Sequence, residues 1–408
     1  MTLRVAVVGG GIAGLAFAAA AQRLGLDASV RVYEKDGPPR ESEAGLQLGP
    51  NATRILQRLG AGPALRAVSA RPDTLDFVHG RDGSPLLTVP VRPAYAERFR
   101  AEHHTLLRAD LRHTLTGLLS ADTVHRERRC ASVTEELGGA RLRFTDGTSE
   151  RADVVVGADG MRSIVRARDR PEPPLVHSGM AACRAVVPIE ALDRRPQASV
   201  RIWVGVGRHF LCYPVASGRR LNVVAIVPDD HAYTHTDTDT RAQAHADRTP
   251  GATPVVAEDL AREFADWDPA VAALVRAAPA IHRVPLLDRE PFAEWSTAHT
   301  TLIGDAAHPM LPHQAQGACQ AIEDAVTLAT MLRAADRRGV PEALRRYAAL
   351  RAPYTARVQR GSREHGALMH SADGVALLAR SRPEDVLDLV ADTYGHDAEQ
   401  QALAASAG

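Results

Sequence analysis

The first part of the chain alternates between apolar strands and a helix. Residues 5–8 form a continuous apolar run, as in a strand that is covered on both faces. A glycine-rich turn and a helical stretch at 15–24 follow, and the chain then enters a second apolar strand at 30–33. This order predicts an α/β domain that begins with a parallel sheet.

The hydrophobic pattern changes beyond a proline-rich segment at 171–174. Four apolar or alternating segments that follow it have the length of antiparallel strands. They predict a second domain with a mixed sheet, so that the class is α/β at the start of the chain and α+β overall. The four segments are 182–187, 200–205, 210–215 and 221–227.

Shorter patterns complete the outline. Residues 229–253 are polar and without periodicity, which predicts a surface excursion. The other expected elements are a hairpin within 75–92, a helix that begins at 104, a β-meander over 131–148, helices at 255–264 and 271–278, a helix from 317 to 332, a long amphipathic helix from 341 to about 358, and a helical tail that starts near 383.

Composition excludes several classes of protein. The 408 residues carry 49 basic and 49 acidic side chains, so no attraction to nucleic acid or to an anionic membrane is expected. The N-terminus enters a strand directly, without the pattern of a signal peptide, and the apolar run 12–21 is too short to cross a bilayer. Cys130, Cys183, Cys212 and Cys319 show no CxxC spacing, which argues against a zinc site or a disulfide framework and fits a reducing cytoplasm.

The turn after the first strand has the spacing of a dinucleotide-binding fingerprint. Gly9, Gly11 and Gly14 occupy the glycine positions of GxGxxG, which permit a tight turn, close approach to a pyrophosphate, and close packing of helix on strand. Glu34 ends the next strand about twenty residues later, where a carboxylate can bind ribose hydroxyls. An acid at this place disfavours a 2′-phosphate, so we predict FAD or NAD rather than NADP.

Two further apolar runs end in an aspartate. The run 154–157 leads to Asp159, and a run that starts at Thr301 leads to Asp305. The carboxyl end of a strand is the usual ligand position in a doubly wound sheet. Beyond Asp305, a loop rich in proline and histidine reaches a helix that opens at Gly317 and directs free backbone N–H groups at whatever lies before it. We expect all three regions to bind one dinucleotide.

These stretches together resemble the motifs of the class A FAD-dependent aromatic hydroxylases, which have the p-hydroxybenzoate hydroxylase fold. Residues 157–163 (GADGMRS) look like the DG motif of that family, and residues 304–309 (GDAAHP) look like its GD motif. The LPHQ sequence at 311–314 is most similar to the salicylate hydroxylase and hydroxynicotinate monooxygenase types. The resemblance covers residue 3 to about residue 365.

The resemblance implies a Rossmann-like FAD-binding domain, a mixed-sheet substrate domain and C-terminal helices. The expected segments are 1–174 for the first part of the FAD-binding domain, 175–284 for the substrate-binding sheet, 285–365 for the return to the FAD-binding domain, and 366–408 for a helical tail.

The reaction that the resemblance implies is hydroxylation of a small aromatic acid. NAD(P)H would reduce FAD as a transient visitor, because the chain has a single glycine fingerprint. Dioxygen would then add to the flavin C4a, and the hydroperoxide would deliver one oxygen to a phenolic or heteroaromatic acid of the salicylate, hydroxybenzoate or hydroxypyridine kind. The expected protein is a cytoplasmic monomer or homodimer, with neither a nucleic acid nor a membrane as partner.

Site residues follow from matching the family motifs. Gln47 lies in the run that lines the flavin ring, at a position where hydroxynicotinate-type enzymes carry His, which argues against that exact substrate. Arg108 is carried by the family's arginine-bearing helix, and Pro309 would pack beside the flavin. No metal site is predicted. The cofactor-binding set is Gly9, Gly11, Ile12, Ala13, Gly14, Glu34, Gln47, Arg108, Asp159, Asp305, Pro309, Gly317 and Ala318.

The catalytic candidates are His313, His209 and Tyr213. His313 would face the substrate, whereas His209 and Tyr213 are four residues apart on one strand and therefore share a face. Which of them acts as the base stays open, and Tyr213 could equally be a buried tyrosine with a satisfied hydroxyl. Arg184 is a weaker candidate for a carboxylate clamp, because its strand face is undetermined by the pattern.

Two alternatives stay open. A flavin oxidase or reductase of the same fold would insert no oxygen into its substrate. An NAD-dependent dehydrogenase, or a nucleotide-binding protein without catalytic activity, would carry the fingerprint and bind no flavin.

Overall fold

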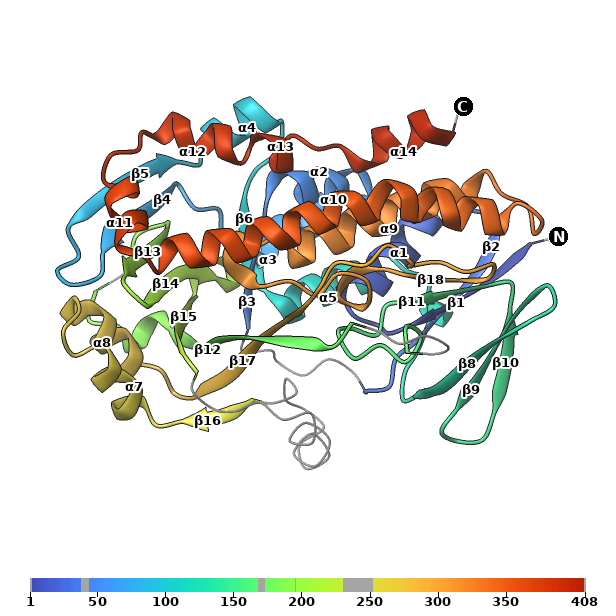
Figure 1. Ribbon diagram of the computed structural model, residues 1–408, viewed down its shortest axis with the longest axis horizontal. Helices are drawn as coiled ribbons and strands as arrows, with labels where there is room; N and C mark the ends of the chain where they lie inside the picture. The colour runs from blue at the N-terminus through green and yellow to red at the C-terminus, as the bar shows by residue number, and fades with distance from the viewer. Residues whose placement is uncertain (1, 38–43, 168–172, 195, 230–251, 407–408) are drawn as a thin grey trace.

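The structure, a computed structural model, describes residues 2–37, 44–167, 173–194, 196–229 and 252–406. Two sheets occupy opposite ends of an elongated molecule, and two long helices, α9 (Gly317–Arg333) and α10 (Val340–Met369), lie side by side along its length (Figure 1). The arrangement confirms the predicted fold class.

Five parallel strands form the first sheet in the described ranges. Its central residue Val7 pairs with Val156 on one side and Val32 on the other, and all three side chains are fully buried. Continuous valine runs suit strands that are covered on both faces. The order is β18 (Thr300–Leu302), β11 (Val154–Gly157), β1 (Leu3–Val8), β2 (Ala28–Tyr33) and β7 (Val124–His125).

Helix α1 (Ile12–Arg23) covers this sheet closely. Every side chain from Leu15 to Ala21 is buried, and most of them are alanine, so the helix backbone approaches both the strands and α9. Helix α5 (Arg108–Thr116) packs on the other side of α1. This packing fixes the glycine-rich turn between β1 and α1 in space.

Within the described part of the chain, the second sheet has eight strands and is antiparallel except for one parallel pair, β13 with β4. Helices α7 (Ala257–Glu263) and α8 (Pro269–Arg276) cover one face, against which Trp203, Phe210 and Phe264 form an apolar cluster. The order is β16 (Thr253–Val255), β17 (Ile281–Arg289), β12 (Leu175–Pro188), β15 (Arg220–Pro228), β14 (Arg208–Val215), β13 (Ser199–Gly205), β4 (Thr74–His79) and β5 (Pro85–Pro90).

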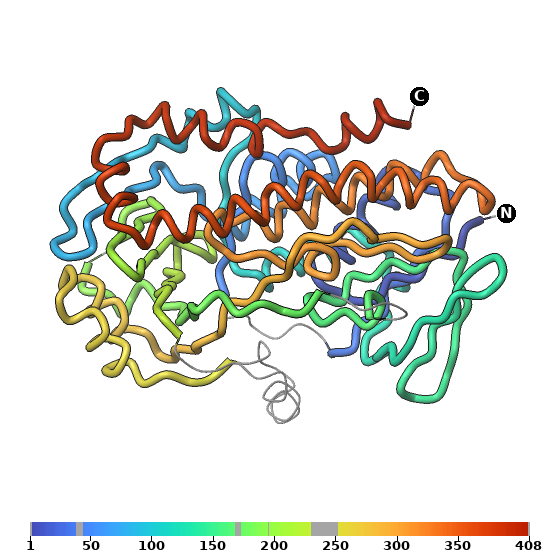
Figure 2. The backbone as a smooth tube through the Cα atoms, viewed as in Figure 1, coloured from blue at the N-terminus to red at the C-terminus, as the bar shows by residue number. Residues whose placement is uncertain are grey.

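The C-terminal tail folds back over the molecule. After α10 the chain reverses, and the tail runs antiparallel to α10 toward the end where the N-terminus lies (Figure 2). Its helices are α11 (Ala372–Leu378), α12 (Pro383–Leu389), α13 (Ala391–Tyr394) and α14 (Ala398–Ser406).

Smaller elements connect these layers. A two-stranded ladder lies between α9 and strand β14 of the large sheet, and a three-stranded meander projects at the far end of the molecule (Figure 1). These elements are β3 (Gly45–Leu48) with β6 (His104–Leu107), β8 (Cys130–Glu136) with β9 (Gly139–Phe144) and β10 (Ser149–Ala152), the helices α2 (Pro50–Arg58), α3 (Gly62–Val68) and α4 (Ala94–Phe99), and the 3-10 turns Ala121–Thr123, Ile189–Ala191, Ala216–Gly218, Gly304–Ala306 and Pro312–Gln314.

Two boundaries predicted from the pattern are wrong. The segment His104–Leu107 is a strand rather than the start of a helix, because it pairs with β3 and is buried throughout; the helix begins at Arg108. The long helix α10 continues to Met369 instead of ending near residue 358. Ser362 and Gly366 are buried in this last part, so tertiary packing sustains the helix.

Some expectations fall on residues that the structure does not describe. The first two residues of the proline-rich segment at 171–174 lie outside the described ranges, and so does nearly all of the polar stretch 229–253. Within the described ranges, no helix combines the length and the apolar character that crossing a bilayer requires.

Candidate functional site

A cavity of about 440 Å³ lies where the two sheets meet. The glycine-rich turn contributes Gly11, Ile12 and Ala13, and the GDAAHP stretch contributes Asp305. The start of α9 and one face of the eight-stranded sheet form further parts of the lining. Segments separated by about three hundred residues therefore surround one space, as the three nucleotide-binding motifs predict.

The glycine-rich turn is shaped for close contact with a dinucleotide. Gly9 has φ +109°, and a Cβ there would stand 2.3 Å from the carbonyl oxygen of Ala158. A Cβ on Gly14 would stand 2.1 Å from the carbonyl oxygen of Gly9. At Gly11 no atom lies within 4 Å of the Cβ position, so the backbone faces open space in the cavity. These three environments fit a turn that receives a pyrophosphate.

The two acids nearest this turn are set back from the cavity surface. Glu34 is buried and accepts hydrogen bonds from the backbone N–H of Gly10, at 2.8 Å, and of Asp36. Asp159 accepts the backbone N–H of Ile164 at 2.8 Å through Oδ2. Its Oδ1 is buried without a hydrogen-bond partner among the described residues, and burial raises the pKa of this carboxyl group. An acceptor left open in this way fits a bound group that donates a hydrogen bond.

The GDAAHP stretch ends a strand and delivers the chain to the start of α9. Asp305 lies in a 3-10 turn at the cavity wall. Gly317 and Ala318 open α9 at the same wall, and their N–H groups belong to the first turn, which has no intrahelical acceptors. Pro309 is buried and lies outside the cavity lining, whereas the next residues, from Met310 to Pro312, reach it.

Gln47 and Arg108 both line the cavity, as predicted from the family motifs. The Oε1 of Gln47 is 3.1 Å from Nε2 of His103, and burial lowers the pKa of His103 to about 3, so this imidazole is neutral. When the neutral ring of His103 donates its Nε2–H to Oε1 of Gln47, the side-chain amide of Gln47 is held in one orientation. Its NH₂ group is then available to the cavity. Gln47 is therefore positioned as a hydrogen-bond donor.

The register of the large sheet places Arg184 in the cavity. Arg184 on β12 pairs with Val224 on β15, and Val224 pairs with Leu211 on β14. Partners that are directly opposite point to the same face of a sheet, and all three side chains line the cavity. His209 and Tyr213 lie two residues before and two residues after Leu211, and both line the same cavity. This confirms the prediction that they share one face of the strand.

No described residue gives Arg184 an anionic partner. Neither a hydrogen bond nor an ion pair engages it among the described residues, and its Nε is buried without a partner. Burial lowers the pKa of the guanidinium, as it does for any cation removed from water. Tyr213 lies nearby and is 4% exposed, and burial raises the pKa of its hydroxyl well above the usual value. Arg184 is half-buried, so its charge is partly withdrawn from water and favours an anionic partner, which no described residue supplies.

Three imidazoles gather at the end of the cavity. The ring centroids of His209, His313 and His370 lie between 4.9 and 5.8 Å apart. His313 packs against Gly366 of α10, where a Cβ would stand 2.4 Å from its Cδ2. Burial lowers the pKa of His313 to about 4 and that of His209 well below its usual value, so both rings are neutral near pH 7. Neutral imidazoles can accept a proton from a substrate.

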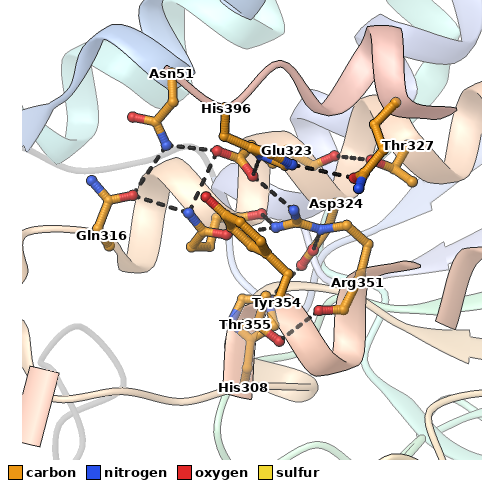
Figure 3. Close-up of polar contacts among 12 residues, drawn as sticks. Asn51, His308, Gln316, Glu323, Asp324, Thr327, Arg351, Tyr354, Thr355 and His396 are labelled. Atoms are coloured by element: carbon orange, nitrogen blue, oxygen red, sulfur yellow. Dashed lines mark hydrogen bonds and ion pairs between the residues drawn. The ribbon is translucent and has the colours of Figure 1, made fainter. Parts of the chain in front are cut away.

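A buried polar network holds the start of α9 in place (Figure 3). Arg351 of α10 donates to Glu323 at 2.7 Å and to Asp324 at 2.8 Å, and none of the three side chains is exposed. Burial alone would raise the pKa of Asp324, but His308 and Arg351 hold it below the usual value. His308 contacts Asp324 at 2.5 Å.

The same network reaches the first turn of α9 and the tail. Asn51 of α2 donates to Gln316 at 3.1 Å and to Glu323 at 2.6 Å. His396 of the tail contacts Glu323 at 2.9 Å. One ionic cluster thereby joins α2, α9, α10 and the tail behind the cavity wall (Figure 3).

The structure brings most, but not all, of the predicted residues to one cavity. Its wall includes Gly11, Ile12, Ala13, Gln47, Arg108, His209, Tyr213, Asp305, His313, Gly317 and Ala318. Gly9, Gly14, Glu34, Asp159 and Pro309 stand behind it and shape or support the wall.

Sequence reasoning missed several lining residues. Tyr95 of α4 and His103 lie between β5 and β6, and Val390 and Tyr394 come from the tail. His365 comes from the part of α10 that the pattern did not predict. The aromatic character of Tyr95 and Tyr394 is the one signal that could have drawn attention to them, since buried tyrosines are enriched where a polar group meets an apolar wall.

Comparison with known proteins places this cavity in context. Residues 2–362 match a family described as FAD binding domain. The chain is 40% identical over 405 residues to a 3-amino-4-hydroxybenzoate 2-monooxygenase of Streptomyces platensis (PtnB3), covering 97% of this chain and 96% of that protein. It is 33% identical over 365 residues to a 6-hydroxynicotinate 3-monooxygenase of Bordetella bronchiseptica, covering 89% of this chain and 91% of that protein.

Solved structures show the same fold. A salicylate hydroxylase solved as a substrate complex superimposes with a TM-score of 0.80 at 26% identity, over 99% of this chain and 98% of that one. Klebsiella pneumoniae HpxO, solved with FAD and uric acid, gives a TM-score of 0.82 at 26% identity, over 96% of each chain.

Proposed function

The chain belongs to the family of FAD-dependent aromatic monooxygenases, and we propose that it hydroxylates a small aromatic acid that carries both a ring hydroxyl and a carboxylate. The leading substrate is 3-amino-4-hydroxybenzoate or a close relative, because three relatives with that named activity are 38 to 40% identical over most of the chain. Salicylate and hydroxypyridine acids are the next candidates.

The observation that carries the proposal is the guanidinium of Arg184 in the cavity wall, which has no anionic partner among the described residues. Arg184 faces the cavity beside apolar Leu211 and Val224, so an aromatic acid would place its ring on the apolar surface and its carboxylate on the guanidinium. Two parallel hydrogen bonds between guanidinium and carboxylate would satisfy the donors that the protein leaves open.

The hydroxyl of the substrate would meet the neutral bases at the same wall. We propose His209, Tyr213 and His313 as the groups that bind this hydroxyl and remove its proton, since all three line the cavity. A deprotonated phenol is more electron-rich and reacts more readily with an electrophilic oxygen. The raised pKa of Tyr213, caused by burial, keeps its hydroxyl protonated as a donor, whereas His209 and His313 are available as acceptors.

The residues on the opposite wall would hold FAD. Gly9, Gly11 and Gly14 shape the turn for the pyrophosphate, and the backbone N–H groups of Gly317 and Ala318 would meet the pyrimidine edge of the flavin. Ile12, Ala13, Glu34, Gln47, Arg108, Asp159, Asp305 and Pro309 complete the proposed cofactor set. When bound, FAD supplies electron transfer from NAD(P)H and activation of dioxygen.

The remaining parts of the proposal concern assembly and compartment. We propose a cytoplasmic monomer or homodimer built from the four segments expected from the sequence. The free state of all four cysteines fits a reducing compartment.

The test is turnover of the FAD-loaded protein with isotope-labelled dioxygen. NADH and NADPH oxidation would be measured with 3-amino-4-hydroxybenzoate, 4-hydroxybenzoate, salicylate and 6-hydroxynicotinate. The expected result is faster NAD(P)H oxidation with one of these acids and one labelled oxygen atom in its product. Oxidation that yields only hydrogen peroxide with every acid would instead identify a flavin oxidase and contradict the proposal.

A further inference from the structure

Two histidines from distant parts of the chain share a short hydrogen bond at the edge of the cavity. Nδ1 of His209, on β14, lies 2.6 Å from Nε2 of His370, the residue that caps the C-terminus of α10. His209 is 4% exposed and lines the cavity, whereas His370 is half-buried and does not line it. The pair therefore connects the cavity with the outer surface.

The orientation of each ring leaves one nitrogen free at either end of the pair. No described group bonds to Nε2 of His209, which is the nitrogen left to the cavity when Nδ1 faces His370. Nδ1 of His370 likewise has no hydrogen-bond partner among the described residues, and this ring reaches the solvent-exposed side. A path from the cavity to water therefore passes first through Nε2 and Nδ1 of His209. It then passes through Nε2 and Nδ1 of His370.

The backbone fixes this geometry independently of the side chains. The N–H of Gly207, in the turn before β14, donates to the carbonyl oxygen of His370 at 2.8 Å. This bond ties the end of α10 to the strand that carries His209, so substitution of the His370 side chain leaves the connection between the two elements intact. The backbone bond already joins the two elements, so the hydrogen bond between the two imidazoles is not needed to hold them together.

We propose that His370 relays the substrate's hydroxyl proton from His209 to water. This inference rests on the proposed function, in which a phenolic acid occupies the cavity. It assigns a role in proton transfer to a residue outside the cavity lining, which acts through His209 and is a positioning and relay residue.

The proton balance closes over three transfers. The substrate hydroxyl gives its proton to Nε2 of His209, and the proton already on Nδ1 of His209 moves to Nε2 of His370. The proton on Nδ1 of His370 then passes to water. One proton leaves, one phenolate forms, and both rings finish neutral in the opposite tautomer. The reverse sequence protonates the product hydroxyl and restores the starting tautomers.

A relay suits this environment better than a single base. Burial lowers the pKa of His209 well below the usual value, and the neighbouring rings of His370, His313 and His365 lower it further. Burial also lowers the pKa of His370 to about 4. No ion pair with a carboxylate supports either His209 or His370 within the described ranges, so an imidazolium held on His209 would be unfavourable. Passing the proton on avoids a long-lived charge.

The experiment follows proton release by the FAD-loaded protein. In a weakly buffered solution with a pH indicator, stopped-flow mixing with 3-amino-4-hydroxybenzoate reports the proton that appears in solvent. The variants are His370→Ala, His370→Gln and, as a matched control, His113→Gln, which removes an exposed histidine from α5 far from the pair. Flavin absorbance verifies that each variant is folded and loaded.

The relay predicts that both substitutions of His370 slow proton release at least about tenfold, by comparison with the larger effects typical of lost acid–base groups. Substrate affinity should change less than about threefold, and the His113 variant should match the parent. Added free imidazole should restore the rate of His370→Ala, because small bases can enter the vacated space from solvent.

Two results would overturn the relay while leaving the proposed function intact. One is parental proton release in both His370 variants, and the other is slowed release that imidazole fails to restore. If the parent protein itself hydroxylates none of the tested acids, the proposed function fails instead, and the two failures are therefore distinguishable.

Discussion

At the scale of single residues, Arg184 is the group on which substrate choice depends. It is a half-buried cation that faces the cavity beside apolar side chains and has no anionic partner among the described residues. Hydrogen bonds to charged groups contribute about 1.5–3 kcal/mol each. We expect Arg184→Gln to raise KM for 3-amino-4-hydroxybenzoate about 10- to 100-fold, measured by steady-state NAD(P)H oxidation, while flavin content stays unchanged.

The comparison compound is 2-aminophenol, which lacks the carboxylate. The parent protein should prefer the acid strongly, and Arg184→Gln should lose most of this preference. Arg201→Gln is the matched control, since Arg201 lies on β13 of the same sheet, outside the cavity lining, and packs over Trp203. An unchanged preference in the Arg184 variant would show that another group binds the carboxylate.

Local sequence patterns could place His209 and Tyr213 but not Arg184 or His370, because the positions of the last two depend on long-range contacts. His209 and Tyr213 could be placed on one face because alternation along a strand needs only local information. The inward face of Arg184 depends on the pairing of β12 with β15 and of β15 with β14, which are long-range contacts. His370 could not be found at all, because the pattern ended its helix about ten residues too early.

At the scale of elements, the Arg351 cluster holds α9 and α10 together. The guanidinium balances two buried carboxylates, and removing one partner of a buried ionic group typically costs about 3–5 kcal/mol, because the remaining charge is left unpaired. We expect Arg351→Met to lower the free energy of unfolding by about this amount, measured by urea denaturation. Flavin retention should weaken as well, since the start of α9 is anchored by the same cluster.

Arg345→Met on the exposed face of the same helix is the control. Arg345 pairs with Glu342 on the surface, and such pairs contribute about 0–1 kcal/mol. Equal loss of stability in the two variants would contradict a special role for the buried cluster. The comparison separates the effect of buried charge from the effect of methionine in a helix.

Element boundaries show where tertiary contacts override local pattern. The apolar and β-branched segment His104–Leu107 borders a helical repeat, and only its pairing with β3 makes it a strand. The strand, turn and helix around Gly9, by contrast, were predictable because glycine positions and apolar runs carry that information locally.

At the scale of the whole molecule, buried neutral histidines make stability depend on pH. Burial lowers the pKa of His103 to about 3 and that of His104 to about 4, whereas an unfolded histidine titrates near about 6.5. The unfolded state therefore binds more protons between these values, and the stability that is present above about pH 6.5 is lost as the pH falls towards about 4. We expect a lower midpoint of thermal unfolding at about pH 5 than at about pH 7.5.

His104→Gln should flatten this dependence, because an amide can keep the contact with Ser69, which lies 2.7 Å from the imidazole, without taking up a proton. Asp324 acts in the same direction but at lower pH, because its lowered pKa adds stability that is lost only below about pH 4. An identical pH profile in the His104 variant would exclude this histidine as a source.

The overall architecture was predictable because three motifs were expected to bind one dinucleotide, and that expectation fixes the relative position of distant segments, which do meet at one cavity. The tail was not predictable in this way. Val390 and Tyr394 line the cavity through contacts with Tyr95 and α2, and nothing in the tail's own pattern indicates them.

The place of β18 in the parallel sheet has a consequence for synthesis. This strand pairs with β11, but six of the eight described strands of the large sheet, β12 to β17, are translated between the two. The ribosome therefore exposes an incomplete sheet edge beside β11 until residue 302 has emerged, and an unpaired edge is a site where chains associate. Nascent chains that stall within this interval should depend on chaperones more than the finished protein does.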